Sequence, residues 1–293
     1  MSKFFFEVYI MLYKKIALFT TLLMAFSLCA CNNASGNANN TNSDTTSMTE
    51  TQTDSSDDQT VDILSGNQES TQSTDILNFT PPEIGEEIVV INVKDYGTIK
   101  IKLFPDECPK GVENFKRLIS EENYYNGTIF HRVIKDFVIQ GGDPNGNGTG
   151  GQSIWGEGFA QELNGGLRHF AGALAYATAN DHLNKSQFYI VAPADCSQIT
   201  DEQFDEFANY YGASYPDNVK EKYREVGGVP YLDNGYQVFG QVFEGLDVVE
   251  AIQNVQTDSS DKPLEDIVME SVSIEEYDGS SSSTSATDET IEQ

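Results

Sequence analysis

The 293-residue chain has little positive charge. Its 17 Lys and Arg residues stand against 46 Asp and Glu residues, and the net charge is −29. A chain this acidic is repelled by nucleic-acid phosphates and by anionic lipid headgroups. The composition therefore argues against nucleic-acid binding. The charge serves solubility or, as an alternative, favours basic partners.

Cysteine is also scarce, with four residues in the chain. Cys29 and Cys31 fall at the end of an N-terminal apolar run, which leaves Cys108 and Cys196 in the part expected to fold. Two cysteines do not make a disulfide framework. A bridge between Cys108 and Cys196 in an oxidising compartment stays open.

The N-terminal region contains one apolar run, at residues 16–28, which follows two lysines. A membrane span needs about 20 apolar residues, so this run fits the core of a signal peptide better. It ends in LCAC, which resembles the bacterial lipobox, and Cys31 would be the lipidated residue. We expect a signal peptide at 1–31 and a protein held outside the cytoplasm by a lipid anchor in the bacterial cell membrane. An uncleaved signal anchor is the alternative.

The rest of the chain divides by composition into three parts, and the second of them contains an insertion. Residues 32–80 are rich in Asn, Ser, Thr, Asp and Gln and predict a disordered linker, because they cannot bury enough apolar surface. Residues 81–277 hold most of the aromatic and aliphatic side chains and predict one domain. Within it, 195–230 predicts an inserted helical hairpin, either a surface elaboration or a flap beside the binding face. Residues 278–293 predict a disordered acidic tail.

Periodicity within the domain predicts mostly strands. Helical spacing of apolar residues marks 109–120 and 246–252. Strand patterns mark 87–93, 98–103, 129–140, 171–177, 187–191, 236–243 and 268–274. Residues 141–158 are glycine-rich, but no GKS or GKT follows them, which excludes a phosphate-binding loop.

One arginine stands out within the strand pattern. Residues 130–143 read FHRVIKDFVIQGGD, and Arg132 lies among apolar residues. Desolvating an arginine costs several kcal/mol unless it is paired. Arg132 therefore either points to water from an edge strand, or is a cationic donor held beside an apolar pocket and directed at an uncharged polar group of a ligand.

This stretch resembles the signature of the cyclophilin family of peptidyl-prolyl cis/trans isomerases. The resemblance continues through 148–159, 170–190 and 238–244, and covers roughly 88–276 with one interruption. It implies a mostly β fold: a closed antiparallel eight-stranded barrel capped by two helices, here with the inserted helical hairpin. It also implies isomerase (rotamase) activity.

The resemblance assigns roles to nine residues. Arg132 would be the catalytic donor, Gln140 would orient it, and Phe137 would complete the catalytic group. The substrate-binding positions would be Val138, Ala177, Thr178, Tyr189, Leu232 and Tyr236. His131, which precedes the arginine, is interpreted as structural.

Rotation about a prolyl bond breaks no covalent bond, so we expect no metal and no cofactor. The expected partners are proline-containing polypeptides, in particular exported proteins that the enzyme would help to fold as a chaperone. The chain is expected to be a monomer. Val138, Thr178, Tyr189 and Tyr236 depart from the commonest family residues. A catalytically weak module that binds proline-containing segments is therefore the alternative function.

Overall fold

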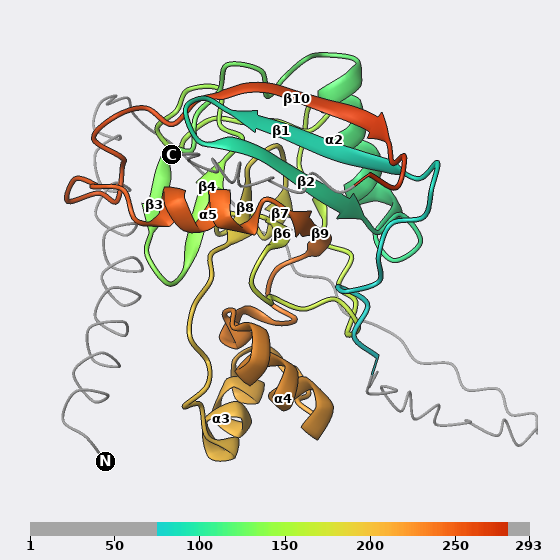
Figure 1. The fold of residues 1–293 in the computed structure, drawn as a ribbon, viewed down its shortest axis with the longest axis vertical. Helices are drawn as coiled ribbons and strands as arrows, with labels where there is room; N and C mark the ends of the chain where they lie inside the picture. The colour runs from blue at the N-terminus through green and yellow to red at the C-terminus, as the bar shows by residue number, and fades with distance from the viewer. Residues whose placement is uncertain (1–74, 281–293) are drawn as a thin grey trace, which may run out of the picture. The chain divides into compact units, whose positions relative to one another are not determined.

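The structure is a computed structural model and describes residues 75–280 (Figure 1). The predicted signal peptide 1–31, with Cys31, lies outside the described residues. So do most of the predicted linker 32–80 and most of the predicted tail 278–293. Between residues 75 and 280, no helix combines the length and the apolar character that crossing a bilayer requires.

Strands dominate the described part of the chain. Eight of them form one antiparallel sheet in the order β10-β1-β2-β9-β6-β8-β4-β3, and β5 pairs with β7 in a small separate sheet. The strands are β1 (Glu87–Val93), β2 (Gly97–Leu103), β3 (Arg132–Ile134), β4 (Val138–Gly141), β5 (Phe159–Ala160), β6 (Ala173–Tyr176), β7 (Leu183–Asn184), β8 (Phe188–Val191), β9 (Val238–Glu244) and β10 (Met269–Glu276).

The eight-stranded sheet is an open half-barrel, so the prediction of a closed barrel was wrong. Its end strands, β3 and β10, do not pair with each other. The backbone N–H of Val133 in β3 instead donates to the carbonyl of Asp261, in the loop before β10, at 2.8 Å. A single bridge between Ile129 and Val268 joins the segments that precede the two strands. The gap is thus spanned by loop backbone and not by a strand ladder.

Two helices pack on this sheet, as the sequence predicts. Helix α2 (Pro109–Ser120) begins at a proline and buries Val112, Phe115 and Leu118 on one face. It contacts β10, whereas α5 (Leu246–Gln253) contacts β2, β3 and β4. Figure 1 shows α5 and α2 at different places along the sheet. The apolar stripes of both helices close the core that the half-barrel leaves open.

Aromatic rings fill the centre of the core. The Phe115 ring meets Phe188 and Phe239 edge-on, with centroids 5.4 and 5.1 Å apart. Tyr176 stacks on Phe239 at 4.3 Å. Such pairs hold the sheet in a single packing arrangement and so give the surface above it a fixed shape.

The packed domain reaches back past the boundary predicted at residue 81. Asn78 is buried, and its Nδ2 donates to the carbonyl of Arg168 at 2.9 Å and to Oε1 of Gln241 at 2.8 Å. The amide of Leu77 also donates to the carbonyl of Gly166 at 2.9 Å. Apolar side chains hold the segment as well, because Ile76 and Leu77 pack against the cores of the domain and the ring centres of Phe79 and Phe170 lie 5.2 Å apart.

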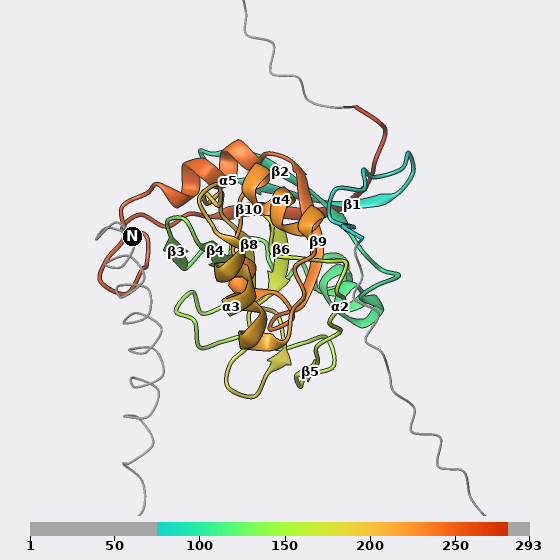
Figure 2. The ribbon, with the colours of Figure 1, turned by 90° about the horizontal axis from the view of Figure 1, so that it is seen from below.

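The predicted insertion contains two helices, α3 (Asp201–Tyr211) and α4 (Asp217–Val226), followed by the 3₁₀ turn η1 (Pro230–Leu232). Thr200 and Gln203 form a capping box at the start of α3. Figure 2 views the domain from the side of the insertion. The helices share a second small core, made by Phe170, Cys196, Phe204, Tyr215, Val219 and Tyr223.

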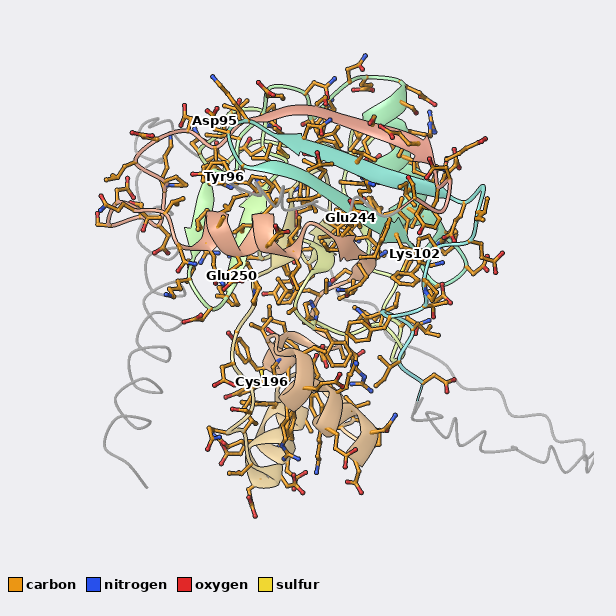
Figure 3. The ribbon with its side chains drawn as sticks, in the orientation of Figure 1. Asp95, Tyr96, Lys102, Cys196, Glu244 and Glu250 are labelled. Atoms are coloured by element: carbon orange, nitrogen blue, oxygen red, sulfur yellow. The ribbon has the colours of Figure 1, made fainter. Side chains whose placement is uncertain are left out.

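The two cysteines of the domain lie in different cores and are not bridged. Cys196 belongs to the core of the insertion (Figure 3), and Cys108 to that of the half-barrel. Both are buried free thiols. Of the two possibilities that the sequence left open, the structure shows the unpaired one.

Candidate active site

The candidate site is a row of side chains across neighbouring strands. In the register of the sheet, Arg132 of β3 faces Gln140 of β4, Gln140 faces Tyr189 of β8, and Tyr189 faces Ala175 of β6. Directly opposed residues point to the same face of a sheet. The short β3–β4 hairpin thus places the arginine and the glutamine side by side.

Arg132 is largely covered and is not a surface arginine pointing into water. Its side chain is 24 % exposed, and Nε lies 3.9 Å from Oδ2 of Asp261. Nη1 donates to Oε1 of Gln140 at 3.3 Å, and the guanidinium carbon lies 5.9 Å from the centre of the Phe137 ring. Burial lowers the pKa of Arg132, and the nearby Asp261 opposes that shift. An arginine stays protonated in proteins, so this face carries a partly desolvated positive charge.

Gln140 is the first link of a chain of amides. Its Nε2 donates to Oε1 of Gln187 at 3.0 Å, and Nε2 of Gln187 donates to the carbonyls of Gly148 and Gly150 at 3.1 and 2.7 Å. The glycine-rich loop therefore fixes Gln187, which fixes Gln140 and through it Arg132. Sequence reasoning missed Gln187. Strand alternation could have found it, because it lies two residues before Tyr189.

Aromatic rings form an apolar patch beside the arginine. Phe137 stacks on Tyr231, with centroids 6.2 Å apart and ring planes 17° apart. Tyr189 and Tyr236 meet edge to face at 6.3 Å. Leu232 follows Tyr231 in η1 and, like Phe137 and Tyr236, is half-buried against the core. Phe137, Leu232 and Tyr236 thus offer half-exposed apolar surface that a small ring can cover, whereas Tyr189 is buried, with 5 % exposed.

The remaining predicted residues take different positions around this aromatic patch. Val138 lies two residues before Gln140 in β4, on the same face of the strand, but at 2 % exposed it offers little surface. Ala177 is half-buried, and its amide donates to the carbonyl of Gln187 at 2.9 Å. Thr178 is half-buried, and its hydroxyl is buried without a hydrogen-bond partner. A buried hydroxyl without a partner is costly and suits a site that a ligand's polar group completes.

His131, interpreted as structural, is buried next to the arginine. Neither of its ring nitrogens has a hydrogen-bond partner, and burial lowers its pKa. Beside a buried guanidinium, a neutral ring adds no further charge to the site. This placement agrees with a packing role.

A buried polar network lies behind Tyr189, and sequence reasoning missed it. The Tyr189 hydroxyl lies 2.9 Å from Nε2 of His169, and Nδ1 of His169 lies 3.0 Å from Oδ1 of Asp233. The same carboxylate accepts bonds from the hydroxyl of Tyr223 in α4, at 2.8 and 2.9 Å, and from Nη1 of Arg168 at 3.4 Å. The network connects α4 of the insertion with Tyr189 in the aromatic patch. The sequence offered one signal, the replacement of phenylalanine by tyrosine at position 189.

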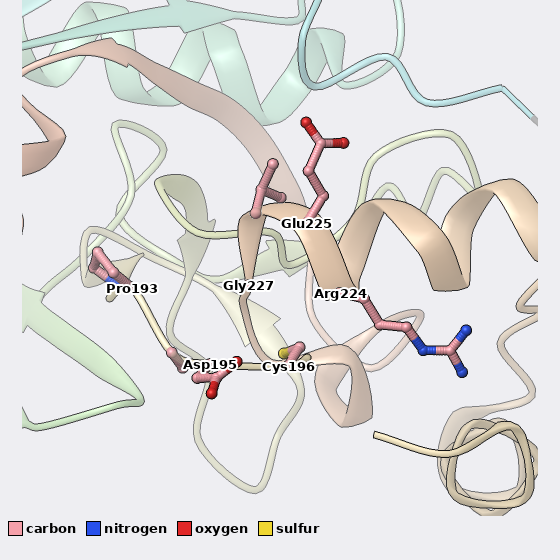
Figure 4. A pocket seen from close by; sticks show the side chains of 8 residues that line it. Pro193, Asp195, Cys196, Arg224, Glu225 and Gly227 are labelled. Atoms are coloured by element: carbon pink, nitrogen blue, oxygen red, sulfur yellow. The ribbon is translucent and has the colours of Figure 1, made fainter. Parts of the chain in front are cut away.

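A separate pocket of about 240 Å³ lies where the insertion leaves and rejoins the half-barrel (Figure 4). It is lined by Pro193, Ala194, Asp195, Cys196, Arg224, Glu225, Val226 and Gly227, none of which is a predicted site residue. At this neck the backbone of Gly228 donates to the carbonyl of Ala194 at 3.2 Å. A Cβ on Gly227 would lie 2.2 Å from that same carbonyl oxygen, so the chains meet backbone to backbone. The pocket belongs to this junction and not to the arginine site.

The part of the chain between residues 75 and 280 has no group of three or more His, Cys, Asp or Glu side chains that could hold a metal ion. The chemistry available at the site is thus that of a fixed cation, neutral amides and hydroxyls, and apolar rings.

Comparison with known proteins agrees with this arrangement. The profile described as cyclophilin type peptidyl-prolyl cis-trans isomerase/CLD matches residues 88–274. The chain belongs to the cyclophilin family of peptidyl-prolyl cis-trans isomerases. The family and the enzyme activity predicted from the sequence are therefore confirmed.

Two bacterial relatives carry the name "Putative peptidyl-prolyl cis-trans isomerase". The one from Staphylococcus saprophyticus is 42 % identical over 192 residues, which span 66 % of this chain and 94 % of the relative. The one from Staphylococcus epidermidis is 41 % identical over 190 residues, which span 65 % of this chain and 93 % of the relative.

A cyclophilin type isomerase of Cryptosporidium parvum, crystallised in the presence of the dipeptide Ala-Pro, has a similar structure. The TM-score is 0.50 and the identity 32 %, with 65 % of this chain and 99 % of that chain covered. Another crystal structure of the same protein gives a TM-score of 0.51.

Proposed function

We propose that Arg132 catalyses the isomerisation by hydrogen bonding to the prolyl nitrogen of a twisted amide, while the proline ring rests on the aromatic patch of Phe137, Tyr189, Leu232 and Tyr236. The observation that carries the proposal is the position of the guanidinium. It is three-quarters covered, bonded to Gln140 and next to the Phe137 ring. A permanent positive charge is thus held at the edge of an apolar surface.

The barrier to this reaction is the loss of amide resonance, about 20 kcal/mol for the uncatalysed bond. In the twisted state the nitrogen regains its lone pair and can accept a hydrogen bond, which the planar amide nitrogen cannot. A donor in this place therefore stabilises the transition state more than the ground state. The rigid guanidinium fork needs no reorientation, because the amide chain of Gln140 and Gln187 holds it.

The pocket supports the other half of the mechanism. The proline ring must stay in place while the preceding carbonyl swings, and apolar rings grip it without competing for hydrogen bonds. Val138, on the same face of β4 as Gln140, adds little surface to it. Ala177 and Thr178 lie where the client backbone would extend, and the Thr178 hydroxyl, which has no partner in the described structure, can bond to a client peptide group.

The clients that we propose are exported proteins, and the enzyme would act on them as a monomer. Support comes from the sequence: the lipobox-like end of the apolar run, and about 50 polar residues between Cys31 and the domain. Such a linker spans on the order of 40 Å and would hold the domain away from the membrane surface. Mass spectrometry of the mature N-terminal peptide tests the anchor, and an unmodified Cys31 would refute it.

A protease-coupled assay with a proline peptide tests the mechanism, with the full chain and its Arg132→Ala variant. Removing a preorganised donor costs roughly 100-fold or more in rate, so we expect a loss in kcat/KM of that order. Arg117→Ala is the matched control, because Arg117 is an arginine of α2 that pairs with Glu113 and Glu121. If Arg132→Ala turns over as fast as wild type, the mechanism is wrong.

The replacements at Thr178, Tyr189 and Tyr236 favour the second candidate, a catalytically weak module that binds proline-containing segments. The same assay separates the two candidates. A weak module would bind the peptide, in isothermal titration, with little turnover in wild type as well as in the variant.

A further inference from the structure

The last residue of α3 lies beside the proposed proline pocket. The ring of Tyr211 meets the ring of Tyr236 at nearly a right angle, 79°, with centroids 6.1 Å apart. Tyr236 in turn meets Tyr189. The insertion therefore adds Tyr211 as a third ring to the row formed by Tyr189 and Tyr236.

Three features of the structure fix Tyr211 in this place. Nδ2 of Asn234 donates to the Tyr211 carbonyl at 2.6 Å. Gly235 makes room for the ring, because a Cβ at that position would lie 2.5 Å from it. Gly212, in the left-handed conformation, ends α3 directly after Tyr211, and its amide donates to the carbonyl of Ala208 at 2.9 Å.

Although it is fixed, the Tyr211 side chain remains 41 % exposed. A rigid, exposed aromatic ring offers a large contact area and loses little conformational entropy on binding, and such rings are common where proteins bind peptides. Burial, together with the neighbouring Tyr211, raises the pKa of Tyr236 to about 12, so the Tyr236 phenol carries no charge near neutral pH. The surface formed by the rings of Tyr211 and Tyr236 suits an uncharged, apolar side chain.

We propose that Tyr211 forms a second side-chain subsite, which binds an aromatic or long aliphatic residue flanking the client proline. The proposal rests on the proposed function, because the pocket formed by Tyr236 and Tyr189 must hold the proline for a neighbouring residue to reach Tyr211. The row of rings is continuous from Tyr189 through Tyr236 to Tyr211. The occupant is therefore the same polypeptide whose proline fills the pocket.

The experiment measures discrimination between peptides. The full chain is assayed with peptides that differ in one residue, Phe or Ala, directly before the proline in one pair and directly after it in another. An aromatic contact contributes about 0.5–1.5 kcal/mol. We therefore expect Tyr211→Ala to lower kcat/KM about threefold to tenfold for the Phe peptide of at least one pair. The Ala peptides should change by less than about twofold.

Matched variants make the result specific. Tyr210→Ala removes the neighbouring tyrosine of α3, which is 51 % exposed and whose ring lies 6.3 Å from that of Phe207. It should leave the Phe-to-Ala ratio unchanged, and Tyr211→Phe should preserve it. Tyr211→Leu provides a second truncation if the alanine variant unfolds, and should lower the ratio to a smaller extent.

Equal losses on Phe and Ala peptides would overturn the subsite, as would an unchanged ratio in both pairs. The proposed mechanism fails separately, if Arg132→Ala retains wild-type turnover on all four peptides. The two failures are distinguishable, because the subsite is measured as a ratio between peptides and the mechanism as an absolute rate.

Discussion

The hydrogen bond between Tyr189 and His169 permits a quantitative prediction. Nδ1 of His169 lies 3.0 Å from the Asp233 carboxylate and Nε2 lies 2.9 Å from the Tyr189 hydroxyl, so each ring nitrogen has one hydrogen-bond partner. His169 is 1 % exposed, so water cannot replace a lost partner. Tyr189→Phe therefore leaves a buried ring nitrogen of His169 without a hydrogen-bond partner.

Leaving such a group unsatisfied costs about 1–3 kcal/mol. The phenylalanine ring keeps the aromatic contact with Tyr236, so almost no packing is lost. With about 2 kcal/mol lost in a domain of some 200 residues, Tm should fall by about 4–8 °C. The wall of the proposed pocket keeps its shape, and we expect kcat/KM to stay within about threefold of wild type, a barrier change below about 0.7 kcal/mol.

Thermal and urea unfolding of wild type, Tyr189→Phe, His169→Leu and the double variant give the test. The two residues share one bond, so the second substitution should cost less in the presence of the first, with a coupling of about 1 kcal/mol. A Tyr189→Phe variant as stable as wild type would refute the reasoning. So would strictly additive losses, because both results mean that the bond contributes nothing.

Two further predictions concern acid sensitivity and thiol reactivity. Burial raises the pKa of Asp143. Hydrogen bonds from backbone N–H groups, including those of Asn145 and Gly148 at 2.8 and 2.6 Å, lower it by more, so the pKa of Asp143 lies below its usual value. The ionised carboxylate stabilises the fold fully above the unfolded-state pKa of about 4, and this stability is lost as the pH falls through the folded-state pKa. The Tm of Asp143→Asn should therefore fall less between pH 5 and pH 2 than the Tm of wild type. Equal decreases in Tm would contradict this. Burial raises the pKa of both Cys108 and Cys196 to about 12, so iodoacetamide at pH 8 should modify neither thiol in the folded protein and both after unfolding; peptide mapping that finds either one modified in the folded state would contradict this.

The hairpin at the centre of the candidate site could be predicted from sequence because its contacts are local. Arg132 and Gln140 lie symmetrically about Asp136, which has a positive φ of 57°, and this symmetry makes them cross-strand partners. The short segment of alternating residues with a central turn determines both the strands and their register. The side-by-side placement of arginine and glutamine follows from these nine residues alone.

The features that could not be predicted depend on contacts between distant residues. At the open edge of the half-barrel, the amide of Val133 bonds to a carbonyl 128 positions later, at Asp261, and not to a strand partner in β10. The partner of Tyr189 is His169, and β6, a loop and β7 separate the two residues along the chain, so no periodicity connects them. Tyr211 lies beside the proposed pocket because the Asn234 side chain bonds to its carbonyl and Gly235 leaves room for its ring. In each case the position of the residue depends on one hydrogen bond or close contact with a distant part of the chain. Local sequence patterns carry no information about such contacts.

The narrow neck of the insertion has an evolutionary consequence. Its outgoing and returning chains touch at Ala194, Gly227 and Gly228, so the segment between them begins and ends at nearly the same point. Residues can be gained or lost between these positions while β8 and β9 keep their alignment. Natural selection can therefore remodel this lobe in related isomerases without rebuilding the scaffold that carries the arginine.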